Sequence, residues 1–159
     1  MKVSYPGIYK VAYLQCEELP PNINYKAMAK VPVGIYPTPT YIDTDGKSEC
    51  DTETDFDNNS KIEKATLKFS TTESLPVHIH LAFVIYTVRG EKYIIGCKEA
   101  PYPIIKVKST TGSPDWQRNI INYEITFTAR KALVQCAVKS RKIVLRLFLL
   151  LFSNPAKHF

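Results

Sequence analysis

The chain has 159 residues, of which 45% are hydrophobic and 11% aromatic, and it carries a formal net charge of +6. This length suits one domain with a substantial core, and the hydrophobic content excludes an intrinsically disordered protein. The charge is unevenly distributed, because eight of the fifteen acids lie between Asp43 and Glu63 and the last part of the chain is basic. Such a layout is compatible with an anionic partner, although charged runs are commonly solvated faces.

The N-terminal residues, the length of the apolar stretches and the cysteines bear on the cellular compartment. Pro6, Gly7 and Lys10 interrupt the apolar residues of the N-terminus, so we expect no signal peptide. No stretch reaches the roughly 20 apolar residues that cross a bilayer as a helix. The four cysteines are widely spaced without a CxxC pair: Cys16, Cys50, Cys97 and Cys136. We therefore expect reduced thiols and a cytoplasmic protein with no transmembrane segment.

The first part of the chain predicts short extended elements and one helix. Tyr9–Cys16 is the first predicted strand, and Asn22–Lys30 is predicted to be a short helix with Asn22 or Asn24 as its N-cap. Val31–Ile42 contains three prolines, which remove ladder donors and indicate an edge strand or an irregular segment. The acidic, turn-rich stretch Asp43–Ser60 offers little to bury except Cys50 and Phe56, and we expect a surface loop there.

The middle of the chain gives the clearest strand signals. Lys61–Ser70 alternates between apolar and polar residues, as a strand with one face in water does. Val77–Val88 is the longest predicted strand, and both of its faces are apolar, so we expect it to be central and covered. Arg89-Gly90 predicts a tight turn into a strand over Glu91–Cys97, since glycine supplies the positive φ of a two-residue hairpin.

Three more strands complete the predicted domain. They are Ile104–Lys108, Asn119–Ala129 and Arg130–Val138. Short connections between many strands favour an antiparallel arrangement over a parallel α/β one. We therefore predict a mainly β protein, with residues 1–138 forming a single antiparallel β-sandwich or barrel-like domain that has at most one short helix.

Residues 139–159 have a different character. A basic stretch leads into Ile143–Phe152, ten residues of which only Arg146 is polar. In water these side chains would promote aggregation. Three alternatives remain open: a buried final element, a docking segment for another subunit, or a tail that is not part of the fold. We favour the last two because the domain looks complete at Val138.

Metal chemistry has only weak candidates. His78 and His80 share one face of a predicted strand, but a site would need two further ligands and no feature supplies them. The segment Asp55–Ile62 partly matches a calcium loop, but Ser60 stands where the loop needs glycine. More plausibly Asp57, Asn58 and Asn59 turn the chain into the next strand. We predict no metal and no cofactor, and leave open whether Asp43–Asp57 binds a cation.

Catalytic and nucleic-acid-binding patterns are missing from the sequence. It contains no GxSxG motif, no Cys–His pair at a recognisable spacing and no clustered glycines, so we do not expect an enzyme. Lysines on the solvent faces of two predicted strands, Lys64–Lys68 and Lys106–Lys108, could form a basic stripe. No aromatic residues interleave with them, and we do not expect nucleic acid as a partner.

Exposed aromatic residues are the best candidates for an interface or a ligand site. Trp116 lies in a polar loop, and Tyr102 lies in a loop framed by Pro101 and Pro103. Tyr36 and Tyr41 belong to the proline-rich segment. Trp and Tyr dominate binding hot spots, although Trp116 could equally fold back over the edge of its own core.

Five stretches resemble a family of small, uncharacterised proteins encoded by phages and prophages. They read VSYPGIYKVAYL, DNNSKIEKATLKFSTTESLP, LAFVIYTVRGEKYIIG, KEAPYPIIKV and YEITFTARKAL, and together they span about residues 1–138. The Ile143–Phe152 tail departs from the family pattern. The resemblance implies a structural protein associated with the tail or connector of a phage-like particle, and it brings no catalytic residues with it.

Two hypotheses about function follow. The first is a non-enzymatic structural or assembly protein that self-associates or docks on other particle components through sheet edges and loops, in the cytoplasm or within a phage-like particle. The alternative is a β module that binds a carbohydrate or peptide on its exposed Tyr and Trp loops.

Overall fold

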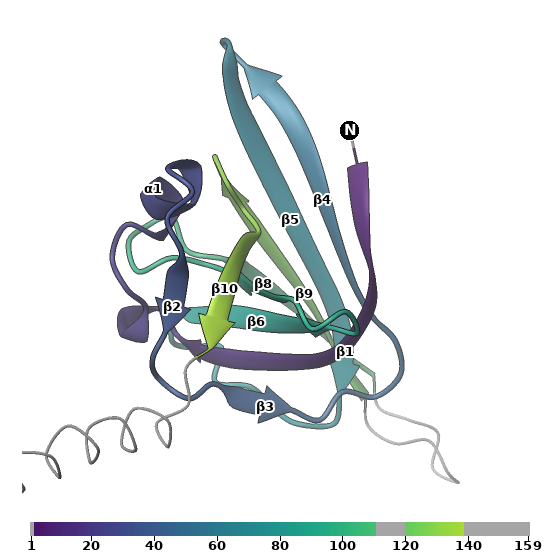
Figure 1. The fold of residues 1–159 in the computed structure, drawn as a ribbon. Coiled ribbons are helices and arrows are strands. Elements are labelled where there is room, and N and C mark those ends of the chain that lie inside the picture. The colour runs from purple at the N-terminus through teal and green to yellow at the C-terminus, as the bar shows by residue number, and fades with distance from the viewer. Residues whose placement is uncertain (1, 111–119, 139–159) are drawn as a thin grey trace, which may run out of the picture.

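The structure, a computed structural model, describes residues 2–110 and 120–138. Within these residues, ten strands form one curled sheet that resembles half a barrel, and a single short α-helix lies beside it (Figure 1). The predicted fold class, mainly β and barrel-like with at most one short helix, is confirmed. Trp116 and the predicted tail over residues 139–159 lie outside the described residues.

The sheet runs in the order β2-β10-β7-β6-β1-β4-β5-β9-β8, and β3 pairs with β1 off this path. Only the β10–β2 pair is parallel among the described strands. The strands are β1 (Lys2–Gln15), β2 (Val33–Ile35), β3 (Thr40–Ile42), β4 (Ser48–Asp57), β5 (Ser60–Thr71), β6 (Leu81–Thr87), β7 (Lys92–Ile95), β8 (Ile104–Thr110), β9 (Ile120–Ala129) and β10 (Val134–Val138). A 3₁₀ turn, η1 (Cys16–Glu18), and the helix α1 (Ile23–Met28) follow β1.

Strand β6 is covered on both faces, as its sequence predicts, and all seven of its residues are buried. Leu81, Phe83 and Ile85 belong to one core cluster, which also contains apolar side chains of β4, β5 and β9. The alternate residues Ala82 and Val84 belong to a second cluster on the opposite face. There α1, β2 and β10 supply the cover. The central strand thus holds two cores together.

The predicted bounds of this strand are too wide, and it is not the longest. Residues 77–80 form turns, in which the Val77 N–H donates to the Leu75 carbonyl at 2.8 Å. The longest strand is β1, with 14 residues. The turn that follows β6 is also longer than two residues, because Thr87 and Glu91 close it: the Thr87 N–H donates to the Glu91 carbonyl at 2.9 Å.

The expectation of a surface loop over Asp43–Ser60 is wrong, because most of it is strand β4. Cys50 and Thr52 are buried on its inner face. The acids alternate with them, and Glu49 and Glu53 stand directly opposite Lys68 and Lys64 of β5. Opposite charges across a ladder stabilise a strand pair. The acid-rich composition therefore conceals a strand in which two of the acids are matched by lysines of the neighbouring strand.

The helix and the proline-rich segment agree in position with their predictions. Helix α1 is shorter than the predicted Asn22–Lys30, and Asn22 caps it in the left-handed conformation without a side-chain hydrogen bond. Ile23 is the buried residue that anchors the helix to the second core. The proline-rich Val31–Ile42 yields only two three-residue strands, β2 and β3, of which β2 lies at an edge of the sheet.

Replacing Gly96 with alanine is expected to lower the free energy of unfolding by about 1–3 kcal/mol. Gly96 has φ of 132°, and an added Cβ would lie 2.8 Å from Ala82 Cβ and 3.2 Å from the Ala82 Cα of β6. Urea unfolding measures the change. Gly90→Ala is the control, since its positive φ of 88° adds strain but nothing lies within 4 Å of its added Cβ. Equal losses for both variants would contradict the close approach.

Candidate functional site

The β4–β5 hairpin extends beyond the rest of the sheet (Figure 1). Its ladder continues to the Asp57–Ser60 pair. On the β5 side the neighbour β9 is paired only from Glu63 onward, and on the β4 side β1 is paired only as far as Glu53. Residues 54–62 therefore have no strand neighbour beyond the hairpin within the described part of the chain. At about 3.3 Å per residue, the tip projects about 15 Å past Glu63.

The tip closes in a two-residue turn that the sequence encodes. Asn58 and Asn59 have φ of 47° and 64°. Positive φ at both central residues is the type I′ geometry that suits a hairpin, and asparagine adopts it more readily than most residues. The prediction that Asp57, Asn58 and Asn59 turn the chain is confirmed, and the partial match to a calcium loop falls in this hairpin.

Phe56 is the exposed large apolar side chain of the projecting segment, with 73% of it in solvent, whereas Ile62 is half-buried. It lies on the same face of β4 as Cys50 and Thr52, which are buried, because residues two apart share a strand face. Farther along the strand the covering elements end, and the aromatic ring is left in water. Asp55 precedes it, and the Phe56 N–H donates to Asp55 Oδ1 at 2.9 Å. On this face the Phe56 ring stands opposite Lys61 of β5, while Asp55 lies on the other face of the strand.

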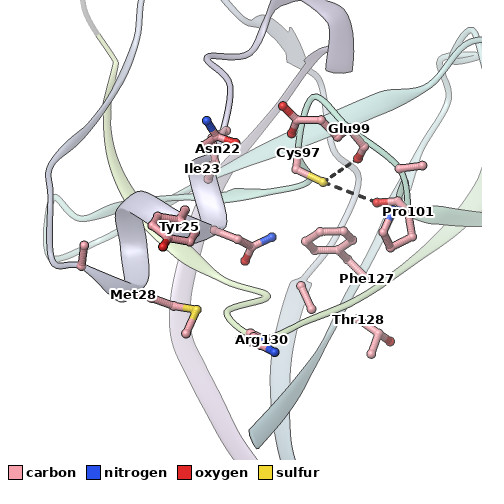
Figure 2. A pocket seen from close by; sticks show the side chains of 14 residues that line it. Asn22, Ile23, Tyr25, Met28, Cys97, Glu99, Pro101, Phe127, Thr128 and Arg130 are labelled. Atoms are coloured by element: carbon pink, nitrogen blue, oxygen red, sulfur yellow. Dashed lines mark hydrogen bonds between the residues drawn. The ribbon is translucent and has the colours of Figure 1, made fainter. Parts of the chain in front are cut away.

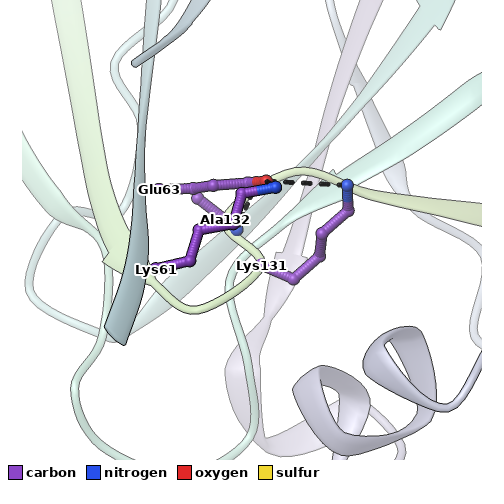
Figure 3. Close-up of polar contacts among 4 residues, drawn as sticks. All are labelled: Lys61, Glu63, Lys131 and Ala132. Carbon is purple, nitrogen blue, oxygen red and sulfur yellow. Dashed lines mark hydrogen bonds and ion pairs between the residues drawn. The ribbon is translucent and has the colours of Figure 1, made fainter. Parts of the chain in front are cut away.

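The root of the hairpin is held by Glu63, whose side chain is only 8% exposed (Figure 3). The Ala132 N–H, in the loop between β9 and β10, donates to Glu63 Oε2 at 3.3 Å. Two ammonium groups approach its other oxygen: Lys61 Nζ at 3.6 Å and Lys131 Nζ at 3.7 Å. The carboxylate therefore joins the hairpin to the β9–β10 loop at the point where the hairpin leaves the sheet.

A pocket of about 730 Å³ opens near this root (Figure 2). Three segments line it: residues 22–25 with 28 and 29 around α1, residues 97 and 99–101 of the loop after β7, and residues 127–130 at the end of β9. Ile23 and Phe127 are buried lining residues. Tyr25 and Met28 also line it and are 79% and 54% exposed. The pocket therefore combines an apolar interior with an exposed tyrosine and methionine.

The pocket and the hairpin root share a stretch of β9. Ala129, a lining residue, is the strand partner of Glu63. Arg130 follows it, lines the pocket and is exposed. The projecting tip, the hairpin root held by Glu63 and the pocket thus form one continuous region of the molecule.

The thiol in the pocket is not activated for attack. Cys97 Sγ donates to the Glu99 carbonyl at 2.9 Å and lies 3.4 Å from the Pro101 carbonyl (Figure 2). Burial raises the pKa of this thiol. A nucleophilic cysteine needs a lowered pKa and a neighbouring cation or base. The lining is therefore better suited to binding than to nucleophilic chemistry.

The predicted histidine pair is not on a strand. Pro76 starts the turns that place His78 and His80 in the connection before β6, and both are exposed. The His80 ring stacks on that of the candidate Tyr102, with centroids 3.8 Å apart. The described residues hold no group of three or more His, Cys, Asp and Glu side chains that could bind a metal.

Tyr41 belongs to a cluster that sequence reasoning missed. Lys10 Nζ lies 3.4 Å from the centre of the Tyr41 ring, a cation–π contact, and the Tyr86 ring lies 5.9 Å away. The register gives the reason. Lys10 of β1 pairs with Tyr86 of β6, and Ala12, two residues farther along the same face of β1, pairs with Tyr41 of β3. Tyr36 is exposed and directly follows β2. Trp116, the remaining candidate, lies outside the described residues.

The four cysteines are expected to resist alkylation in the folded protein. Burial raises the pKa of Cys50 and Cys136 from 9.0 to about 12, and burial together with the nearby Cys97 does the same for Cys16. Because the thiolate is the reactive form, iodoacetamide at about pH 8 should label these sites slowly until the chain unfolds. Mass spectrometry before and after denaturation measures this, and equally rapid labelling of folded and unfolded protein would contradict it.

The same shifts predict how stability depends on pH. Above pH 9.0 the unfolded thiols lose protons that the folded thiols keep. The folded state then binds more protons than the unfolded state, so the free energy of unfolding falls as pH rises from 9.0 toward about 12. Urea unfolding along this range measures the decline. Cys50→Ala should flatten it relative to wild type, and an unchanged slope would contradict the assignment.

Comparisons with protein-family models, with curated proteins and with solved structures find no match for this chain. Within residues 2–110 and 120–138, none of the helices has the length and apolar content needed to span a membrane.

Proposed function

We propose that this protein is a non-enzymatic structural or assembly component, in the cytoplasm or within a phage-like particle, that acts by docking on other proteins. The observation that carries the proposal is the projecting β4–β5 hairpin with Phe56 exposed near its tip. The phage-family resemblance of about residues 1–138 supports the context but not the mechanism. No catalytic step enters the proposal.

Beyond its own two strands, the tip has no strand neighbour among the described residues. A two-stranded hairpin without further packing is marginally stable in water, so a clamped root and an ideal turn are needed to hold it out. An exposed phenylalanine gains about 1.5–3 kcal/mol when it is fully buried. A projecting segment that ends in an aromatic ring therefore gains stability when another protein covers it, and aromatic anchors of this kind dominate interfaces.

A ligand-binding β module is the second candidate, and the pocket favours it. Its volume lies within the roughly 300–1,000 Å³ of small-ligand sites. The tyrosines on which this alternative was based support it less. Tyr102 is half-buried and stacked on His80, and Lys10 lies against the ring of Tyr41. The exposed hairpin therefore supports assembly better than those rings support ligand stacking.

The experiment is co-expression of the full chain with the products of the genes that flank its own. Wild-type protein is expected to enter an assembly of defined mass, measured by sedimentation. Phe56→Ser should stay outside it, because the anchor is lost while the fold remains. Val88→Ser, at an exposed position in the β6–β7 loop, is the matched control and should assemble normally.

Two results would overturn the proposal. One is wild-type protein that remains a monomer alone and in every combination. The other is assembly that Phe56→Ser and Val88→Ser leave equally intact, since the hairpin would then not be the docking element.

A further inference from the structure

We propose that the hairpin tip, residues 54–62, docks into the pocket between α1 and the end of β9 on a second copy of this chain. This inference rests on the proposed function and names the partner for the hairpin. The interface is heterologous at each contact: the tip of one protomer meets the pocket of the other. Two such contacts make a reciprocal dimer, and successive ones make a ring or an open chain.

The pocket fits the chemistry of the tip. Its buried lining includes Ile23 and Phe127, and Met28 and Tyr25 are exposed beside them. Methionine packs adaptably against aromatic rings, and ring pairs prefer offset or edge-to-face contacts. With about 730 Å³, the pocket has room for the Phe56 ring and part of the adjoining strand.

Charge favours the same pairing. The tip carries Asp55, Asp57 and Lys61, a formal charge of −1, while the three segments around the pocket carry +2, with Arg130 and Glu99 in the lining and Lys26 and Lys98 beside it. Arg130 lines the pocket directly. Opposite charges at the rim of an interface guide the encounter and suppress wrong partners.

Geometry separates the tip from the pocket of its own protomer. The pocket shares Ala129 with the hairpin root, where that residue pairs with Glu63. The tip lies about 15 Å farther along the same hairpin, so it extends away from its own pocket. A nine-residue tip buries less than a standard interface of about 1,600 Å², and each single contact is therefore expected to be weak, micromolar or weaker.

The first experiment measures association of the purified full chain by sedimentation from micromolar to millimolar concentration. Wild-type protein is expected to associate. Phe56→Ser and Arg130→Glu should each weaken association at least about thirtyfold, as loss of a hot-spot residue does. Arg89→Glu repeats the charge reversal, and Val88→Ser replaces another exposed apolar side chain with serine; both positions lie in the β6–β7 loop, and both variants should leave association unchanged.

The second experiment mixes the two defective variants. Phe56→Ser keeps an intact pocket and Arg130→Glu keeps an intact tip, so one functional contact remains in a mixed pair and none in either variant alone. Equimolar mixing should restore association, and every pair should contain one molecule of each variant. Labelling each variant with a different fluorophore detects such pairs. Circular dichroism and urea unfolding verify that both variants are folded.

The outcomes separate this inference from the proposed function. Wild-type protein that stays monomeric when pure, yet enters an assembly with flanking gene products in a Phe56-dependent way, overturns self-docking and leaves the hairpin as the docking element. Self-association that neither variant weakens also overturns self-docking through the tip and the pocket. This result is expected if another segment fills the pocket. Absence of both kinds of association overturns both proposals.

Discussion

Replacing Phe83 with alanine is expected to lower the free energy of unfolding by about 3–5 kcal/mol. Phe83 lies at the middle of β6 and is fully buried. Its ring packs beside that of Phe69, with centroids 6.0 Å apart, so the substitution removes an aromatic contact as well as buried area. The neighbouring side chains of a ten-stranded sheet cannot close the cavity without moving the ladders on both sides.

Urea unfolding of the full chain measures this loss, and Phe56→Ala is the matched control. It removes the same ring from a site that is 73% exposed, so its effect on the monomer should stay within about 0.5 kcal/mol. The comparison must be made at a concentration where wild-type protein is monomeric, because association would add its own stability. Similar losses for the two variants would contradict the assignment of Phe83 to the core and of Phe56 to the surface.

The contrast between β6 and β4 shows why part of the fold could be predicted. Strand β6 is apolar at every position from Leu81 to Ile85, and that composition alone predicts a strand covered on both faces. Strand β4 carries acids at alternate positions, and two of them, Glu49 and Glu53, stand opposite lysines of β5. A pattern of charges is favourable in a strand only when the neighbouring strand supplies the opposite sign. The formation of β4 therefore depends on its pairing with the neighbouring strand, and its composition alone could not predict it.

The candidate site was predictable only in its local parts. The asparagine pair at 58 and 59 indicates a turn, and Phe56 stands out as an apolar residue in a polar stretch. Neither observation indicates that the hairpin extends past its neighbouring strands, because this extension depends on where β1 and β9 stop pairing. The pocket depends on three segments that are far apart in sequence. Its lining came together through the curl of the sheet, which no local pattern encodes.

Glu63 could have been singled out only after the register was known. In sequence it is one acid in an alternating strand, with lysines at 61 and 64. Its position at the inner face, where β5 leaves β9, makes it a buried carboxylate with a backbone donor. A buried acceptor of this kind is costly to leave unpaired and strongly stabilising when paired. The hairpin can project because this residue fixes its base.

Glu63→Ala is therefore expected to destabilise the protein by about 2–3 kcal/mol, the range for a hydrogen bond to a buried charged group. The substitution leaves the Ala132 N–H without its acceptor and removes the charge that faces Lys61 and Lys131. Both lysines are substantially exposed, so the ion pairs themselves contribute little, and Lys131→Ala should cost less than about 1 kcal/mol. Glu63→Gln keeps an oxygen acceptor and should fall between the two.

Hydrogen exchange would show whether this residue holds the hairpin as well as the fold. In Glu63→Ala the amides of residues 54–62 should exchange faster than in wild type, relative to those of β6, because the root is released. Glu49→Ala is the control, since Glu49 is exposed on the same hairpin and forms an ion pair with Lys47 at 3.6 Å. If Glu63→Ala left the tip amides as protected as in wild type, Glu63 would not be the residue that positions Phe56, and the docking geometry would need another support.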